Sequence, residues 1–81
     1  MIRERLIEYH LLRIKEGSKA ARLDSIEQLV LLEAVEALEA LRSVVENDEE
    51  VEVRRAALEA GRRLFAALVP PDFEEANRLT V

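Results

Sequence analysis

Cysteine is absent from the 81 residues, which excludes a disulfide framework, a thiol nucleophile and a cysteine-based zinc site. Aromatic residues are scarce, so the core has to be built from leucine, valine, isoleucine and alanine. No stretch approaches about 18 uncharged apolar residues, and no membrane span is expected. Residues 1–16 carry charges throughout and lack a cleavage site of small residues, which argues against a signal peptide and favours a cytoplasmic protein.

Glycine and proline occur only at Gly17, Gly61, Pro70 and Pro71. No run alternates apolar and polar residues between turn pairs, which argues against a sheet. The composition, 49 % hydrophobic and 36 % charged, is typical of packed amphipathic helices. We therefore predict an all-α fold of about four helices, with one domain over residues 1–69 and a C-terminal tail over residues 70–81.

Two turn signals, Gly17-Ser18 and Asn47-Asp48, divide the helical part of the chain. Glycine suits the left-handed position after a helix, and Ser18 and Asp48 suit the position before one. In the tail, Asp72 is expected to cap a short turn that contains Phe73. The expected helices are residues 2–15, a second from residue 19, a third over residues 34–46 and a fourth after Asp48 to about Leu68.

The first helix carries two apolar stripes at helical spacing. One contains Ile2, Leu6, Tyr9 and Leu12, and the other contains Ile7, Leu11 and Ile14. Together they are wider than one neighbouring helix needs. This width favours self-association or a fixed place in a larger complex.

The sequence matches itself at an offset of 32 residues, with Arg22 against Arg54 and Glu27 against Glu59. Leu6, Tyr9 and Leu12 then align with Leu38, Leu41 and Val44. Each copy has the pattern of helix, short turn and helix. A period of this length indicates a helical solenoid, although two repeats are fewer than the three or so that usually give a stable one.

The stretch from Asn47 to Ala60 contains an Asp-bearing turn, then Val53-Arg54, then Ala56-Ala57. It resembles the second-helix signature of HEAT-like repeats, a group that includes short bacterial HEAT-like proteins and the repeats of phycobiliprotein lyases. The resemblance covers residues 6–68 and implies two HEAT-like helical hairpins with a role in protein binding and scaffolding. It also implies that Arg54 is structural, with Asp48 as its candidate partner.

The stretch between the two copies departs from that family, because no glycine, proline, asparagine or aspartate occurs between Ile26 and Val45. Two arrangements therefore stay open. In one, the chain turns near Glu33-Ala34-Val35 and folds back. In the other, the second and third helices fuse into one long helix whose apolar side is buried in an exchanged dimer.

No constellation of residues points to an active site. His10 is the only histidine, has no converging ligands and is expected to be a surface or interface residue. The glutamates lack the repeated Glu-x-x-His pattern of a di-metal bundle, and no serine has an acid–base pair to activate it. We expect no enzyme activity, no metal and no cofactor.

The expected function is protein–protein interaction or scaffolding, with protein partners and a homo-oligomer, most simply a dimer. One alternative is an accessory, chaperone-like subunit of an enzyme or chromoprotein system. Another is a nucleic-acid-binding repeat, which the net charge of −5 makes unfavourable. Phe65 and Phe73 are candidate hydrophobic docking residues, and the candidate partner contacts are Arg22, Asp24, Gln28, Arg55, Glu59 and Arg62.

Overall fold

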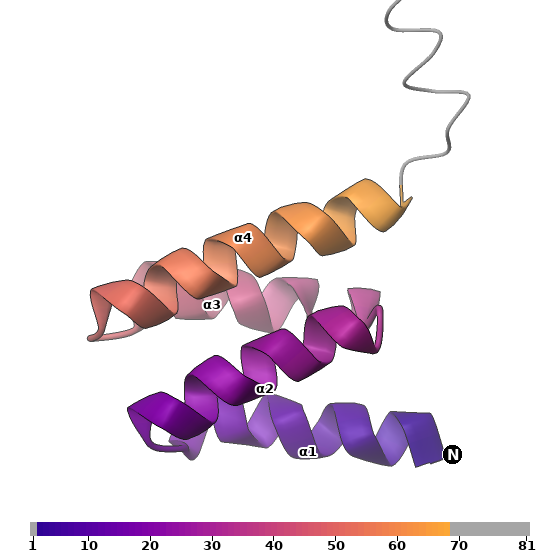
Figure 1. The fold of residues 1–81 in the computed structure, drawn as a ribbon, viewed down its shortest axis with the longest axis horizontal. Coiled ribbons are helices and arrows are strands. Elements are labelled where there is room, and N and C mark those ends of the chain that lie inside the picture. The colour runs from indigo at the N-terminus through magenta and orange to yellow at the C-terminus, as the bar shows by residue number, and fades with distance from the viewer. Residues whose placement is uncertain (1, 69–81) are drawn as a thin grey trace, which may run out of the picture.

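A computed structural model of the chain describes residues 2–68, which form four α-helices and one short 3-10 helix (Figure 1). The all-α fold with four helices is confirmed. The predicted tail, the cap at Asp72 and the docking residue Phe73 lie outside the described residues. The elements are α1 (Ile2–Glu16), α2 (Lys19–Leu31), η1 (Val35–Ala37), α3 (Leu38–Asn47) and α4 (Val51–Leu68).

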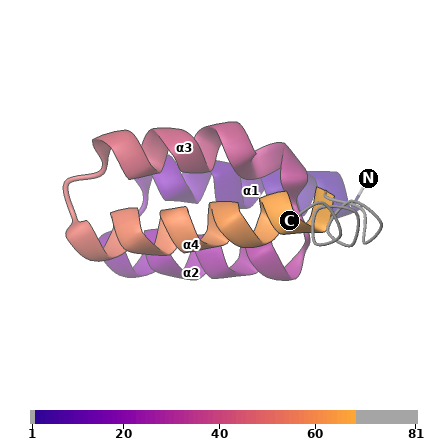
Figure 2. The ribbon, with the colours of Figure 1, turned by 90° about the horizontal axis from the view of Figure 1, so that it is seen from above.

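The four helices form two antiparallel hairpins, α1 with α2 and α3 with α4, stacked one on the other (Figure 1). Seen from above, α1 and α3 form one layer and α2 and α4 form the other (Figure 2). The stack therefore has two ends. We call the outer face of the first hairpin the α1–α2 end and the outer face of the second hairpin the α3–α4 end.

Both predicted turns are present, but Gly17 does not adopt the left-handed conformation expected for it. Ser18 caps α2, because its hydroxyl accepts a hydrogen bond from the backbone N–H of Ala21 at 3.2 Å. In the second hairpin the Asp48 carboxylate accepts from the backbone N–H of Glu50 at 2.9 Å, just before the first turn of α4. Side-chain acceptors thus satisfy backbone donors that a helix start leaves unpaired.

The chain also turns between α2 and α3, which is the folded-back arrangement of the two that the sequence left open. The N–H of Ala34 bonds to the carbonyl of Leu29, and the N–H of Glu33 bonds to that of Val30. This pair of bonds is a Schellman motif. Glu33 occupies its left-handed position, with φ of 52°, where glycine is the usual residue.

Arg3 of α1 binds this turn from the first hairpin. Its guanidinium donates to the carbonyls of Leu32 and Glu33 at 3.2 Å and pairs with the Glu36 carboxylate at 2.8 Å. The bond between Arg3 and Glu36 lowers the pKa of Glu36 and raises that of Arg3. A turn without local helix-breaking residues is therefore held in part by a residue 30 positions earlier in the chain.

Aliphatic side chains fill the space between the two hairpins, and small residues of α4 permit close packing on α2. In α1 only the stripe of Ile7 and Ile14 is buried, while the other predicted stripe stays exposed. The buried residues that make up this core are Ile7, Ile14, Ile26, Leu29, Ala34, Ala37, Leu41, Val44, Val53, Ala57, Ala60 and Leu64.

Burial does not follow the predicted 32-residue offset in the first helix of each hairpin. Tyr9 is 55 % exposed, whereas Leu41, its predicted counterpart, is 1 % exposed. The buried positions align instead at 34 residues, Ile7 with Leu41 and His10 with Val44. In α2 and α4 the offset of 32 holds for the buried pair Ser25 and Ala57.

Candidate protein-interaction surface

Arg22 and Asp48 join the two hairpins at the end where both intra-hairpin turns lie. The Arg22 side chain donates to both carboxylate oxygens of Asp48, through Nε at 2.8 Å and through a terminal nitrogen at 3.1 Å. Its other terminal nitrogen donates to the Gly17 carbonyl at 2.8 Å. Only 13 % of the Arg22 side chain and 8 % of the Asp48 side chain are exposed. The pair is thus a nearly buried, bidentate link.

Asp48 is held in its ionised form. Burial raises its pKa, but the N–H of Glu50 and the guanidinium groups of Arg22 and Arg54 outweigh that effect and leave the pKa below its ordinary value. Arg54 donates to the backbone carbonyl of Asp48 rather than to its carboxylate. The implied Arg54–Asp48 contact therefore exists through the main chain, while Arg22 occupies the carboxylate.

Arg22, predicted as a partner contact, is engaged within the chain instead of standing free at the surface. Its side chain donates to Asp48 and to the Gly17 carbonyl, and only 13 % of it is exposed. The sequence placed Arg22 beside Arg54 as an equivalent residue, but it did not show that the partner of Arg22 lies in a loop 26 positions later. Arg22 is a stacking residue between hairpins.

His10 is also placed differently from the surface or interface position expected. It is only 7 % exposed, and its Nδ1 lies 2.9 Å from the hydroxyl of the fully buried Ser25. Burial, together with the positive charge of Arg13, lowers the pKa of His10, and Asp24 offsets part of this effect. The histidine is therefore a polar core residue that links α1 to α2.

The remaining predicted contacts do not share one surface. Asp24 is exposed but pairs with Arg13 of α1 at 2.9 Å. Gln28 is half-buried on α2. Glu59 pairs with Arg63 and lines a groove of about 400 Å³ between α2 and α4. Arg62 and Phe65, by contrast, line a different groove, at the α3–α4 end.

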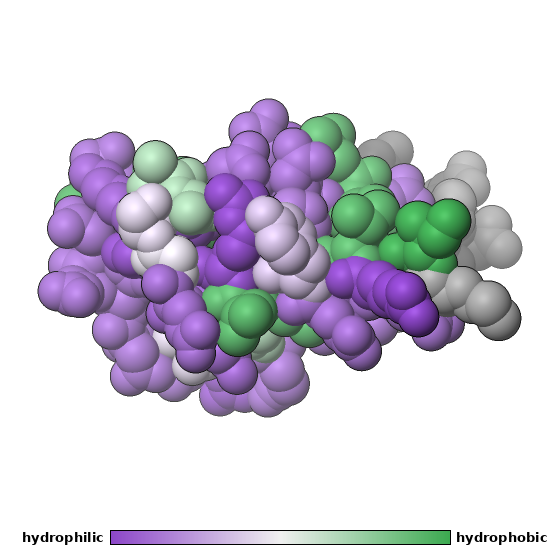
Figure 3. All heavy atoms as spheres, turned by 90° about the horizontal axis from the view of Figure 1, so that it is seen from below, coloured by the Kyte–Doolittle hydropathy of each residue, from purple (hydrophilic) through white to green (hydrophobic). Residues whose placement is uncertain are grey.

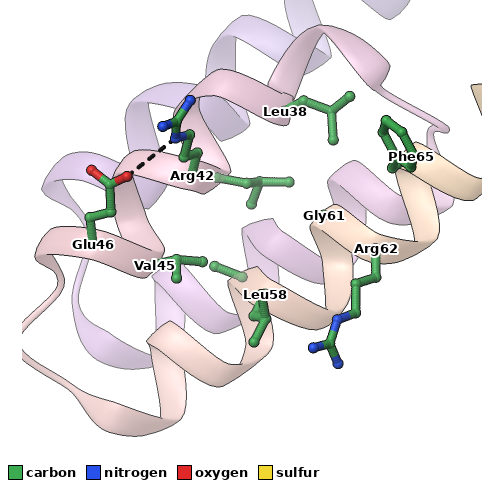
Figure 4. A pocket seen from close by; sticks show the side chains of 10 residues that line it. Leu38, Arg42, Val45, Glu46, Leu58, Gly61, Arg62 and Phe65 are labelled. Atoms are coloured by element: carbon green, nitrogen blue, oxygen red, sulfur yellow. Dashed lines mark hydrogen bonds and ion pairs between the residues drawn. The ribbon is translucent and has the colours of Figure 1, made fainter.

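We call this second depression the α3–α4 groove; it has a volume of about 310 Å³ (Figure 4). Figure 4 shows Leu38 and Val45 of α3 facing Leu58 and Phe65 of α4 across it. Charged side chains stand only at its rims, with Arg42 and Glu46 paired at 3.2 Å on one side and Arg62 on the other. Its lining is Leu38, Leu41, Arg42, Val45, Glu46, Ala57, Leu58, Gly61, Arg62 and Phe65.

The apolar side chains of this groove are exposed where their counterparts in the first hairpin are covered. Phe65 is 62 % exposed and Leu58 is 44 % exposed. At the offset of 32, Leu58 corresponds to Ile26, which is 3 % exposed because α4 packs against α2. An apolar face of α2 is covered by α4. The equivalent apolar face of α4 is covered by no element within residues 2–68.

Gly61 is an additional open feature of the groove. It lies in the middle of α4, where glycine is unfavourable relative to alanine by roughly 0.5–1 kcal/mol. A Cβ atom built at this position meets nothing within 4 Å, and the backbone there is ordinary helix. Among the described residues, nothing requires a glycine at this position. At the offset of 32 its counterpart is Leu29, which is fully buried under α4.

The opposite end of the stack has a different character. The face at the α1–α2 end is mostly hydrophilic, with apolar side chains gathered towards the side where α1 begins (Figure 3). The Arg13 guanidinium lies 5.4 Å from the centre of the Tyr9 ring and also pairs with Asp24. The two ends of the stack therefore differ. The apolar side chains of the α3–α4 end line a groove, whereas those exposed on α1, such as Leu6 and Tyr9, lie among charged side chains.

Most residues of the α3–α4 groove were not among the predicted site residues. The signal that could have found them is a second apolar series on the fourth helix. Val53, Ala57, Ala60 and Leu64 point into the core, whereas Leu58 and Phe65, seven residues apart, lie on another side. Two apolar series on one helix predict two contacts, and only one of them is made within residues 2–68.

No group of three or more histidine, aspartate or glutamate side chains within residues 2–68 is arranged to hold a metal ion. None of the described helices combines the length and the apolar character needed to cross a bilayer. Comparison of the chain with protein-family models, with curated proteins and with solved structures finds no match.

Proposed function

We propose that the chain is a non-enzymatic protein-binding module of the cytoplasm, built from two HEAT-like hairpins, and that it binds its partner through the α3–α4 groove. The observation that carries this proposal is the contrast between Ile26, covered by the second hairpin, and Leu58, exposed at the equivalent position. Exposed apolar surface in a concave site is the usual mark of protein contact.

The chemistry of the groove fits a helical partner. Its length runs between two antiparallel helices, its lining is apolar and its charged groups stand at the rims. A partner helix with apolar side chains three and four residues apart can place them between Leu38 and Phe65. The resemblance to HEAT-like repeats supports the same role, since stacked hairpins of that family present surfaces to other proteins.

Affinity capture from cells that naturally make the chain tests the proposal. The groove variant carries Leu58→Asp and Phe65→Asp, which place carboxylates in the apolar lining. The matched control carries Leu12→Asp, at an exposed apolar residue of α1 that is 55 % exposed. Circular dichroism first establishes that both baits keep the helical fold.

We expect a discrete protein to be recovered with the wild-type chain and the Leu12→Asp control and to be lost with the groove variant. Recovery of the same proteins at the same yield with the groove variant contradicts the proposal. The groove variant can also recover proteins that are absent from the wild-type sample. Such proteins report non-specific binding by the altered surface and do not support the proposal.

A further inference from the structure

We infer that the occupant of the α3–α4 groove is a second copy of this chain, packed face to face about a two-fold axis that runs parallel to α3 and α4. The inference rests on the proposed function, because it names the partner of the same surface. Three observations carry it: the charges at the two rims, the unequal ends of the stack and the position of Gly61.

Two glutamates on α3 and two arginines on α4 flank the groove at matched spacing, and Arg42 also stands on the α3 rim, paired with Glu46. Glu39 and Glu46 are exposed on α3 and are seven residues apart, while Arg55 and Arg62 are exposed on α4 and are also seven residues apart. Seven residues are about two turns, or roughly 10 Å along a helix. Each pair therefore points to the same side of its helix.

The heights of these charges along the helices also correspond. α3 and α4 meet at the loop formed by residues 48–50, so positions can be counted from that loop in both directions. Glu46 lies two residues before this loop and Arg55 lies five residues after it, while Glu39 lies nine residues before it and Arg62 twelve residues after it. Each glutamate is thus offset from its arginine by the same three residues, or roughly 4.5 Å along a helix, which an arginine side chain can span.

A two-fold axis parallel to the helices places α3 of one copy over α4 of the other. Glu46 then faces Arg55 of the second copy, and Glu39 faces Arg62 of the second copy. Each contact occurs twice, because a two-fold interface is formed by the same patch on both chains. A two-fold axis across the helices would instead place α3 over α3, with glutamate facing glutamate. Charge complementarity selects the first arrangement.

The arginine side chains of α4 support this pairing. Neither Arg55 nor Arg62 forms an ion pair with another residue in the range 2–68. On the other rim, Glu46 has only Arg42, one turn away, in a pair whose side chains are 74 % and 58 % exposed. Such an exposed pair is weak, and Glu46 can also accept from an arginine of a second chain.

A head-to-tail stack, with the α1–α2 end of one copy in the groove of the next, fits less well. That end is largely hydrophilic, and its Arg13 is engaged with Tyr9 and Asp24 (Figure 3). At the offset of 32, Asp24 stands where α4 has Ala56, and Gln28 stands where α4 has Ala60. The small residues that let α4 pack closely on α2 are thus replaced by larger, polar ones.

Gly61 allows the two chains of the proposed dimer to approach each other closely. Its missing side chain leaves space in the groove wall that the chain itself does not use. In the proposed dimer this space accepts an apolar side chain from α3 of the second copy. A glycine that weakens its own helix is then explained by contact between chains.

Sedimentation velocity from micromolar to millimolar concentration tests the inference on the full chain. We expect a monomer–dimer equilibrium, with no larger species, because a face-to-face contact closes on itself. Two charge-reversed chains then locate the interface. One carries Arg55→Glu with Arg62→Glu, and the other carries Glu39→Arg with Glu46→Arg.

Each reversed chain alone should dimerise at least about tenfold more weakly than the wild type, because like charges then face each other. When the two are mixed, native mass spectrometry should show a heterodimer, since every contact is again between opposite charges. A matched control with Lys15→Glu and Glu16→Lys, at exposed positions of α1 away from the groove, should dimerise like the wild type.

The inference is overturned if the wild type is monomeric throughout, if both reversed chains dimerise like the wild type, or if folded reversed chains do not combine when mixed. These failures differ from failure of the proposed function. A monomeric chain whose groove variant still loses a captured protein binds a different partner there, whereas a monomeric chain whose groove variant loses nothing has no function at the groove.

Discussion

The Nε of Arg22 lies 2.8 Å from the carboxylate of Asp48, and this bond joins a helix of the first hairpin to the turn of the second. Both side chains are almost completely buried. The carboxylate also accepts from the Glu50 N–H, so a single aspartate anchors the stack and orders the start of α4. Loss of either partner leaves the other as a buried, unpaired charge.

Asp48→Ala should lower the free energy of unfolding by about 3 kcal/mol, because it leaves the Arg22 guanidinium without its carboxylate. Urea denaturation followed by circular dichroism measures the change. Glu59→Ala, which breaks the exposed Glu59–Arg63 pair, is the control and should cost less than about 0.5 kcal/mol. Equal effects of the two substitutions would show that the buried pair does not hold the hairpins together.

The acid sensitivity of His10 gives a second prediction. Its pKa is lowered in the folded chain, so the unfolded chain takes up the proton first as the pH falls. Stability is therefore complete above the ordinary histidine pKa of about 6.5 and declines as the pH falls below it towards the lowered folded value. The ordinary pKa values of aspartate and glutamate lie below that of histidine, so the loss of stability caused by His10 comes at a higher pH than the loss caused by carboxylates.

The measurement is the urea midpoint at about pH 7.5 and about pH 5.5, a range in which histidine is the main titrating side chain. The wild type should be less stable at the lower pH. His10→Gln keeps a polar group near Ser25 but cannot titrate, so its two midpoints should lie closer together. An unchanged pH dependence in His10→Gln would assign the effect to other groups.

The turn between α2 and α3 gives a third prediction. Glu33 has a φ of 52°, a conformation that costs a non-glycine residue roughly 1–2 kcal/mol. Glu33→Gly should raise the free energy of unfolding by about 0.5–1 kcal/mol, after allowance for the greater freedom of glycine in the unfolded chain. Glu33→Ala, the control, should give no gain.

The same substitution separates two kinds of dimer. Glycine at position 33 opposes a continuous helix from α2 into α3, so it should reduce any dimer formed by exchange of hairpins. A dimer formed through the α3–α4 groove should be unaffected. Sedimentation velocity on Glu33→Gly distinguishes the two, and a loss of the dimer would favour exchange.

Gly61→Ala is the fourth prediction, and it should act in opposite directions on folding and on binding. The added Cβ meets open space, and the substitution should stabilise the isolated chain by about 0.5–1 kcal/mol. It also fills the groove, so self-association should weaken. Thermal unfolding at low concentration and sedimentation at high concentration measure the two effects. A variant that is both more stable and more associated would contradict the close approach at Gly61.

The sequence predicted the helices and two of the three turns, because those features have local signals. Ser18 and Asp48 are residues that bond to nearby backbone N–H groups, and this chemistry acts within a few positions. The α2–α3 turn has no such signal. It depends on Arg3, 30 positions away, and on a glutamate in a conformation that glycine usually adopts. The sequence alone therefore left a continuous helix open.

The candidate site was predicted only in part, for a related reason. Arg62 and Phe65, predicted for two different roles, both line the α3–α4 groove. Arg22 and His10 were misplaced, because polarity alone predicts exposure. Their burial depends on the partners Asp48 and Ser25, which tertiary packing supplies. The groove itself needs α3 beside α4 and has no local signature.

The unequal ends of the stack also give the protein a direction. The Ala-lined side of α4 packs on the first hairpin, and the same helix carries an open apolar side facing away from it. A copy of the second hairpin grafted after Leu68 would find a matching surface, whereas one grafted before Ile2 would meet the charges around Arg13. A further hairpin added by design is therefore expected to pack better after α4 than before α1.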